Sequence, residues 1–286
     1  MRTFQVAVCF FLVLPFAASI LGGDPLDWDR HTYLVKVVNR GANNTLKSCT
    51  GVLISSSLVL TASECVLDAT HHPAKEINVL LNVRNSSRRE LAILLDRNER
   101  WAALKIPPID VRKICPTPPE PRGILRLNLR PSLSTSSLLE VSVDEILNSR
   151  CYLVGFETAE KPEDFYANRQ IGRLELEPLK SSQQEPFLFR SESVVNETAC
   201  FDDAGAPMIC DTTAHGTILV GLFQKLGIPA DRLEAIQPAA FTQRLEHCNL
   251  AQEMLCSLFN NELHLIDLLE RHDYSATSWS LARSDF

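Results

Sequence analysis

The sequence predicts an all-β protein of antiparallel strands arranged as a sandwich or barrel, and three observations predict it. Short runs rich in apolar residues recur along the chain, separated by turn-rich stretches. Almost no helical periodicity is present before residue 240. With 286 residues, 45% of them hydrophobic, the chain is long enough for one large or two modest domains. Examples of the expected strands are residues 33–38, 51–60, 77–83, 91–95, 151–156 and 217–223.

Two changes of composition divide the chain. Four prolines between residues 116 and 121 form a stiff connector with few backbone donors, which we interpret as a crossing between two β domains. Beyond residue 245, apolar residues repeat at helical spacing, which predicts a helix with a docking face. This stripe consists of Leu255, Leu258, Phe259, Leu263, Ile266 and Leu269.

The first nineteen residues are typical of a cleaved secretory signal. Arg2 is their only charge, residues 6–18 form an apolar run, and small residues at 17–19 suit signal peptidase. The alternative, an N-terminal membrane anchor, needs about 20 apolar residues, and this run is shorter. No later segment is apolar for long enough to span a membrane. We therefore expect a secreted protein whose mature chain begins at Ile20.

Charge argues against nucleic acid as a main partner. Without Arg2 the mature chain keeps 27 of its 28 basic residues against 35 acidic ones, a formal charge of −8. The weak pair His71 and His72 is the nearest approach to metal-ligand spacing among the histidines, so no metal and no cofactor is expected.

Cysteines and sequons fit an extracellular protein. Eight of the nine cysteines remain after Cys9 is removed, and in a secreted chain they are expected to form disulfides. Asn43, Asn85 and Asn196 begin glycosylation sequons, and we expect at least one to be used on a surface loop.

Two motifs bounded by cysteines carry a resemblance to a known family. Residues 49–65, CTGVLISSSLVLTASEC, resemble without a gap the C-G-G-x-L-I-x-x-x-x-V-L-T-A-A-H-C segment of chymotrypsin-like serine proteases. Residues 200–210, CFDDAGAPMIC, resemble that family's C-x-G-D-S-G-G-P-L-x-C. Shorter segments resemble the family's I-V-G-G, A-L-L-K-L, C-x-V-x-G-W and P-G-V-Y-T, namely residues 20–23, 102–106, 151–156 and 238–242.

The resemblance extends over residues 20–245 and implies two six-stranded β-barrels with a closing C-terminal helix. The expected N-terminal barrel spans about residues 33–115 and the C-terminal barrel about 124–245. Residues 246–286 would form the C-terminal helix and tail. The stretch 122–150 is longer than the family's connection and has no assigned counterpart.

The resemblance assigns each catalytic position, and none carries the residue that catalysis needs. Serine proteolysis requires a nucleophile, a base and a carboxylate that orients the base. Here the base position is Glu64 and the nucleophile position is Ala204, whose methyl group cannot attack a carbonyl. The carboxylate position falls on Arg100, or on Glu99 if the register slips by one.

The family's substrate-binding positions are altered as well. The oxyanion position is Asp202, where a carboxylate would repel a developing negative charge. The segment that pairs with peptide substrates corresponds to Gln224-Lys225-Leu226 and the base of the specificity pocket to Thr198. Ala206 and Ala239 replace glycines of the family.

The resemblance also implies pairings within the fold. Asp203 lies where the family buries an aspartate against the mature amino terminus, so a chain cut before Ile20 would supply an ammonium for it. Cys49 is expected to pair with Cys65, and Cys151 with Cys210. Three connectivities stay open for Cys115, Cys200, Cys248 and Cys256, although Cys115 is expected to reach the C-terminal region.

Two functions remain. The first is a secreted, catalytically inactive protease homologue that binds an extracellular protein, such as an active protease or its substrate, as a cofactor, decoy or regulator. By analogy with similar homologues, its pathway would be immune or reproductive. The alternative is a hydrolase that uses Glu64 and Asp202 as paired carboxylates. Turnover of a peptide panel distinguishes the two.

Overall fold

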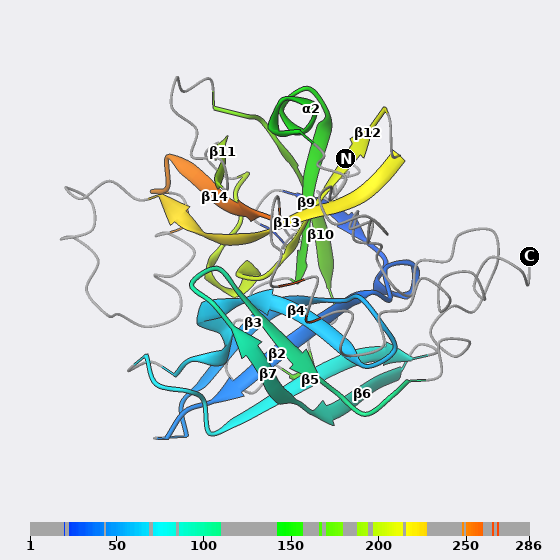
Figure 1. Cartoon of the computed structure of the whole chain (residues 1–286), viewed down its shortest axis with the longest axis vertical. Helices are drawn as coiled ribbons and strands as arrows, with labels where there is room; N and C mark the ends of the chain where they lie inside the picture. The colour runs from blue at the N-terminus through cyan, green and yellow to red at the C-terminus, as the bar shows by residue number, and fades with distance from the viewer. Residues whose placement is uncertain are drawn as a thin grey trace, which may run out of the picture.

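The chain folds as two antiparallel β-sheets, one packed above the other (Figure 1). The computed structural model describes residues 20, 23–42, 44–68, 71–83, 86–109, 142–156, 166–167, 170–179, 188–193, 197–213, 216–227, 248, 250–259, 265 and 268. The expected signal segment, the asparagines of the three sequons, Cys115, Ala239 and residues 122–141 lie outside this part of the chain.

The first sheet has seven strands in the order β6-β5-β2-β3-β4-β8-β7. Its strands are β2 (Leu34–Arg40), β3 (Leu46–Leu53), β4 (Leu58–Ala62), β5 (Glu76–Val83), β6 (Ser86–Leu91), β7 (Ile93–Arg97) and β8 (Trp101–Lys105). The run 51–60, expected as one strand, contains the end of β3 and the start of β4. A serine-rich turn separates them, in which the Ile54 amide donates to the carbonyl of Leu58 at 3.0 Å.

One bent strand closes this sheet into a barrel. β6 and β7 lie at opposite edges of the sheet, but only Ala92 separates them in the chain. The Ala92 amide donates to the carbonyl of Ile77 at 2.9 Å at the bend. Since β6 pairs with β5 and β7 pairs with β8, the bent strand joins both edges.

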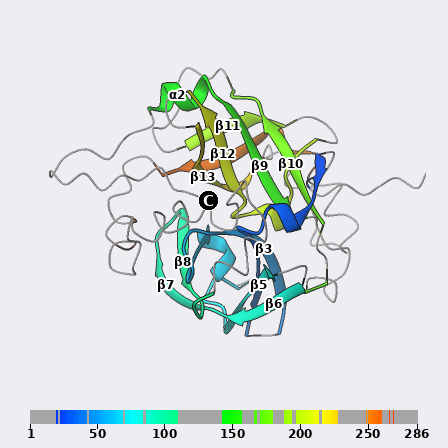
Figure 2. The same cartoon turned by 90° about the vertical axis from the view of Figure 1, so that its right-hand side faces the viewer.

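The second sheet has the order β1-β10-β9-β12-β13-β14-β11. Its strands are β1 (Asp24–Leu26), β9 (Arg150–Phe156), β10 (Ile171–Leu176), β11 (Leu188–Glu192), β12 (Pro207–Thr212), β13 (Gly216–Gly227) and β14 (Glu253–Leu258). Residues just after β10 bond to β11, since the Leu179 amide donates to the Arg190 carbonyl and the Glu192 amide to the Glu177 carbonyl, each at 2.9 Å. β1 is an addition at the side of β10 (Figure 2). Each sheet has six strands, as predicted, when β6 and β7 are counted as one bent strand and β1 is left out as an addition.

Short helices flank the barrels. They are the 3-10 turns η1 (Trp28–Arg30), η2 (Ser63–Val66) and η4 (Phe201–Asp203), and the helix α2 (Val143–Leu147). Ser142 caps α2, its Oγ accepting from the Glu145 amide at 3.1 Å, and Ile146 is buried in the second barrel. The end of the unassigned stretch 122–150 therefore belongs to the barrel.

The prediction of a helix beginning near residue 255 is wrong for its first part. Residues 253–258 form β14, which lies between β13 and β11 and makes ladder hydrogen bonds on both sides. The second sheet thus extends beyond the expected end at residue 245. A short apolar run is compatible with either a helix or a strand. Here the run forms a strand because it pairs with a neighbouring strand on each side. Leu265 and Leu268, one helical turn apart, are helical and buried against the interface between the barrels.

Side chains from both sheets form that interface. Trp28 and Phe156 meet edge to face with ring centroids 4.8 Å apart, and the Trp28 indole donates to the carbonyl of Leu34 at 2.9 Å. Val154, Leu222 and Trp101 belong to the same buried cluster. The two barrels therefore share an apolar seam, and the candidate site lies along it.

Candidate functional site

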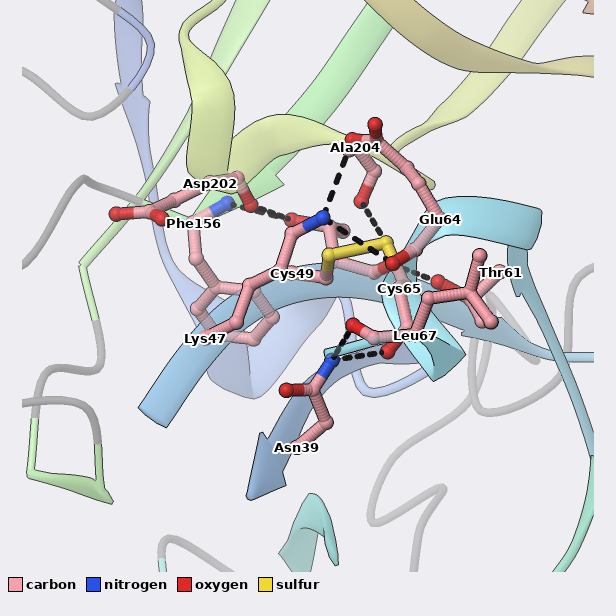
Figure 3. The surroundings of a disulfide bond; sticks show 11 residues. Asn39, Lys47, Cys49, Thr61, Glu64, Cys65, Leu67, Phe156, Asp202 and Ala204 are labelled. Atoms are coloured by element: carbon pink, nitrogen blue, oxygen red, sulfur yellow. Dashed lines mark hydrogen bonds and ion pairs between the residues drawn. A yellow bond between two sulfur atoms is a disulfide. The ribbon is translucent and has the colours of Figure 1, made fainter. Parts of the chain in front are cut away.

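The expected base position, Glu64, lies on η2, which a disulfide fastens to β3. Cys49 and Cys65 are bonded, and the buried amide of Asn39 donates to the carbonyls of Cys65 and Leu67 at 2.8 and 3.0 Å (Figure 3). The Glu64 side chain is 47% exposed and its Oε1 lies 3.7 Å from Lys47 Nζ. Lys47 also donates to the Glu64 carbonyl at 3.1 Å. Glu64 is therefore an exposed acid held by a lysine.

The expected carboxylate position, Arg100, lies beside η2 through its backbone. The Ser63 amide donates to the carbonyl of Arg100 at 3.2 Å, and the Ser63 hydroxyl donates to the carbonyl of Asn98 at 2.6 Å. The Asn98 Oδ1 accepts from the amides of Arg100 and Trp101, each at 2.8 Å. The Arg100 side chain extends to β14, where Nη1 donates to the carbonyl of Leu258 at 3.3 Å. Burial lowers the pKa of this guanidinium.

The expected nucleophile position, Ala204, is closed against the first barrel. The residue is 1% exposed and belongs to that barrel's buried cluster. Its carbonyl accepts from the Thr50 amide at 2.9 Å and lies 3.4 Å from the Cys65 sulfur (Figure 3). These contacts bring the Glu64 and Ala204 positions together across the seam.

Gly205, the next residue, shows how tightly this turn is packed. Its φ is +83°, and an added methyl group would lie 2.2 Å from the Thr50 carbonyl oxygen and 2.3 Å from Thr61 Oγ1. Only glycine fits this position. Gly205 was not predicted as a site residue, although its place inside the DAGAP segment was the available signal.

The expected oxyanion position is buried. Asp202 is 3% exposed and lies on η4, and its carbonyl oxygen lies 3.4 Å from Thr50 Oγ1 as an acceptor. Thr198, at the position of the pocket base, is buried and its Oγ1 is bonded to the Ser193 hydroxyl at 2.7 Å.

The segment expected to pair with substrate is part of β13. Gln224 donates to the hydroxyl of Ser257 at 2.7 Å, Lys225 is exposed, and Leu226 packs in the core of the second barrel. β13 continues to Gly227 and pairs with β14 there. Among the described residues that the resemblance assigns to substrate binding, Gln224 and Leu226 make internal contacts, whereas Lys225 faces solvent.

Ile20 and Asp203 both lie against Gly155 of β9. A methyl group added at Gly155 would be 2.2 Å from Asp203 Oδ1 and 3.4 Å from Ile20 Cδ1. Ile20 is 2% exposed, and its carbonyl accepts from Gly23 at 2.7 Å, just before β1 pairs with β10. The absence of a side chain at Gly155 makes room for both residues. The Ile20 side chain and the Asp203 carboxyl group therefore pack against the same glycine.

Asp203 itself is completely buried. Its Oδ2 accepts from the Cys200 amide at 2.8 Å, and its Oδ1 accepts no hydrogen bond from the described residues. The pKa of Asp203 is raised to about 8, chiefly by burial and also by Asp202, although the Cys200 amide and Lys36 act to lower it. In a chain that is not cut before Ile20, the nitrogen of this residue is an uncharged amide.

Three disulfides are present among the described residues. Cys49–Cys65 and Cys151–Cys210 are the pairs that the resemblance implied. Cys200–Cys248 is the pairing that the sequence left open. Within the described chain Cys256 forms no disulfide and is buried, and burial raises the pKa of its thiol.

Comparisons with known proteins agree with this fold. Residues 20–103 match the family model described as Trypsin. Among solved structures, 497 chains match, and one of them, titled HL collagenase, aligns with a TM-score of 0.55 over 87% of this chain and 97% of its own, at 14% identity. No curated protein matches the sequence. The chain thus has the chymotrypsin-like fold, with a trypsin-like sequence match over residues 20–103. In the part of the chain that the structure describes, no helix is long and apolar enough to cross a membrane.

Proposed function

We propose that this protein is a secreted, catalytically inactive homologue of the trypsin-like proteases that acts by binding another extracellular protein. The observation that carries the proposal is Ala204, a buried methyl-bearing residue at the nucleophile position, whose carbonyl is bonded to Thr50. Proteolysis by this fold needs a hydroxyl there and a base beside it. Glu64 and Arg100 supply neither a hydroxyl nor an imidazole.

The alternative of a hydrolase with paired carboxylates gains no support from the contacts. Glu64 is half-exposed and ion-paired with Lys47, whereas Asp202 is buried on η4. A general acid and base must reach the same substrate atom or water from compatible sides. Asp202 is enclosed in the interior while Glu64 faces solvent, so a single substrate atom would not reach both carboxyl groups.

The proposed location and partner follow from the scaffold. Three disulfides in the described residues suit an oxidising compartment. Loops on a rigid, cross-linked barrel are well suited to protein recognition, and the acidic chain disfavours nucleic acid. The partner we propose is an active protease or its protein substrate.

Turnover is the direct test of the proposal. The purified chain would be incubated with a broad peptide and ester panel and with a phosphonate probe for active serines, using trypsin as the positive control. We expect neither hydrolysis nor labelling. Hydrolysis that persists in a Glu64→Gln, Asp202→Asn double variant would point to a contaminant, and hydrolysis lost in that variant would establish the carboxylate alternative.

Binding is tested separately. A fixed amount of an active trypsin-like protease would cleave a protein substrate with increasing amounts of this chain present. A saturable change in the cleavage rate supports a cofactor or decoy role. An unchanged rate together with no complex by light scattering, for both enzyme and substrate, contradicts that partner class.

A further inference from the structure

Lys36 is a buried lysine that faces the seam between the barrels. It lies on β2, whose alternate residues Leu34 and Lys36 share one face of the strand. Leu34 belongs to the cluster between the barrels, which places Lys36 on the same side. The residue is 1% exposed, and its Nζ lies 5.6 Å from the ring centroid of Phe156 on β9. A lysine is almost never buried without a compensating charge.

Two buried acids lie across the seam from it. Phe156 follows Gly155, against which Asp203 Oδ1 is packed. Thr50, the cross-strand partner of Lys36, contacts the Asp202 carbonyl oxygen and the Phe156 amide, each at 3.4 Å. Lys36 also acts electrostatically on Asp203, favouring its charged form. We call Lys36, Asp202 and Asp203 the buried charge cluster.

We propose that Lys36 is a built-in counter-ion that holds η4 in its buried position whether or not the amino group of Ile20 has been freed. The cluster carries two carboxyl groups and one ammonium, so a single proton on a carboxyl group makes it neutral in the uncut chain. A freed Ile20 ammonium against Gly155 would replace that proton. Because one ammonium is permanent, the turn does not depend entirely on cleavage. This inference does not rest on the chain being inactive.

Hydrogen exchange at the turn tests the proposal. The Asp203 amide donates to the Cys200 carbonyl at 3.1 Å and the Ala206 amide to the Asp203 carbonyl at 2.7 Å, so their exchange reports on η4. Exchange would be measured in chains beginning at Ser19 and at Ile20. We expect both wild-type chains to be protected. Loss of protection in the Ser19 chain alone would overturn the proposal.

Substitution then separates charge from packing. Lys36→Met keeps the length of the side chain and removes its charge, and we expect about tenfold faster exchange at both amides in either chain. The control Lys105→Met, at an exposed lysine of β8, should leave the exchange unchanged. Adding Asp202→Asn or Asp203→Asn to Lys36→Met should restore part of the protection. Two results would contradict the charge coupling. Either the exchange rates of Lys36→Met equal those of the wild type, or the rate change in each double variant is the product of the changes in the two single variants.

Folding itself decides the remaining case. If Lys36→Met does not fold, restoration of folding by Asp202→Asn or Asp203→Asn supports the proposal, because the second substitution removes the uncompensated charge. If neither restores folding, the failure does not come from an uncompensated charge on Asp202 or Asp203, and the proposal is wrong.

Discussion

Arg100 of the first barrel donates from Nη1 to the carbonyl of Leu258 in the second, at 3.3 Å. The position that the family resemblance assigns to a catalytic carboxylate thus carries a cation that ties the barrels together. Its carbonyl is bonded to Ser63 beside Glu64. One residue therefore anchors η2 through its backbone and β14 through its side chain.

Arg100→Met should destabilise the protein by about 1–2 kcal/mol, because the Leu258 carbonyl loses a charged donor in a partly buried place. Urea unfolding would measure the change in the free energy of unfolding. Arg97→Met, at an exposed arginine of β7, is the control and should change it by less than about 0.5 kcal/mol. Equal effects of the two substitutions would show that the bond to β14 contributes nothing.

Ala204→Ser should leave the protein inactive. The new hydroxyl would lie in a buried turn beside an acid in place of a histidine, and Asp202 would still occupy the oxyanion position. The peptide panel and the phosphonate probe would measure this, with Ala204→Val as the control without a hydroxyl. Probe labelling of Ala204→Ser alone would show that Glu64 acts as a base.

Secreted material should begin at Ile20. Small residues at 17–19 suit signal peptidase, and a cut before Ile20 would free an ammonium on a residue whose side chain packs against Gly155, as Asp203 does. Amino-terminal sequencing measures the start directly. A mature chain that begins at Gly23 or Asp24 would remove Ile20 and end this prediction.

The pH dependence of stability should differ in sign between chains that begin at Ser19 and at Ile20. In the Ser19 chain, burial raises the pKa of Asp203 from its usual 3.8 to about 8, so the folded state holds an extra proton between these values. The free energy of unfolding should then fall as pH rises through this window, by up to about 1.4 kcal/mol per pH unit. In the Ile20 chain, the ammonium should lower the pKa of Asp203. The stabilisation that the charged carboxylate provides is then present at neutral pH and is lost as pH falls through that pKa.

Asp203→Asn provides the matched control for this difference. In the Ile20 chain we expect a loss of about 3 kcal/mol or more at pH 7, because the buried ammonium loses its partner. In the Ser19 chain the same substitution should cost much less and should remove the fall in stability with rising pH. Thermal unfolding of the four proteins across pH 4–9 measures both effects, and equal losses in the two chains would show that Ile20 and Asp203 do not pair.

Several features of the candidate site could be predicted from sequence because they lie within ungapped segments. The motif at residues 200–210 places Ala204 and Asp202, and that at residues 49–65 places Glu64 and the Cys49–Cys65 disulfide. The β class and two-barrel arrangement also follow from strand-like runs and these motifs. Within one ungapped segment the spacing of residues is fixed by the covalent chain. A residue of this segment can therefore be matched to the corresponding position of the family motif by counting.

Other features depended on which distant segments meet. Cys200 pairs with Cys248, β14 replaces the start of an expected helix, and Arg100 bonds to a residue 158 positions away. The sequence by itself placed Glu64, Arg100 and Ala204 at the positions that the resemblance assigns to the catalytic residues. Only the tertiary structure decided that Lys36, Asp202 and Asp203 are buried around one seam and that Ile20 lies beside Gly155. The reason is physical: burial and pairing between barrels depend on packing across the whole fold, which no local spacing encodes.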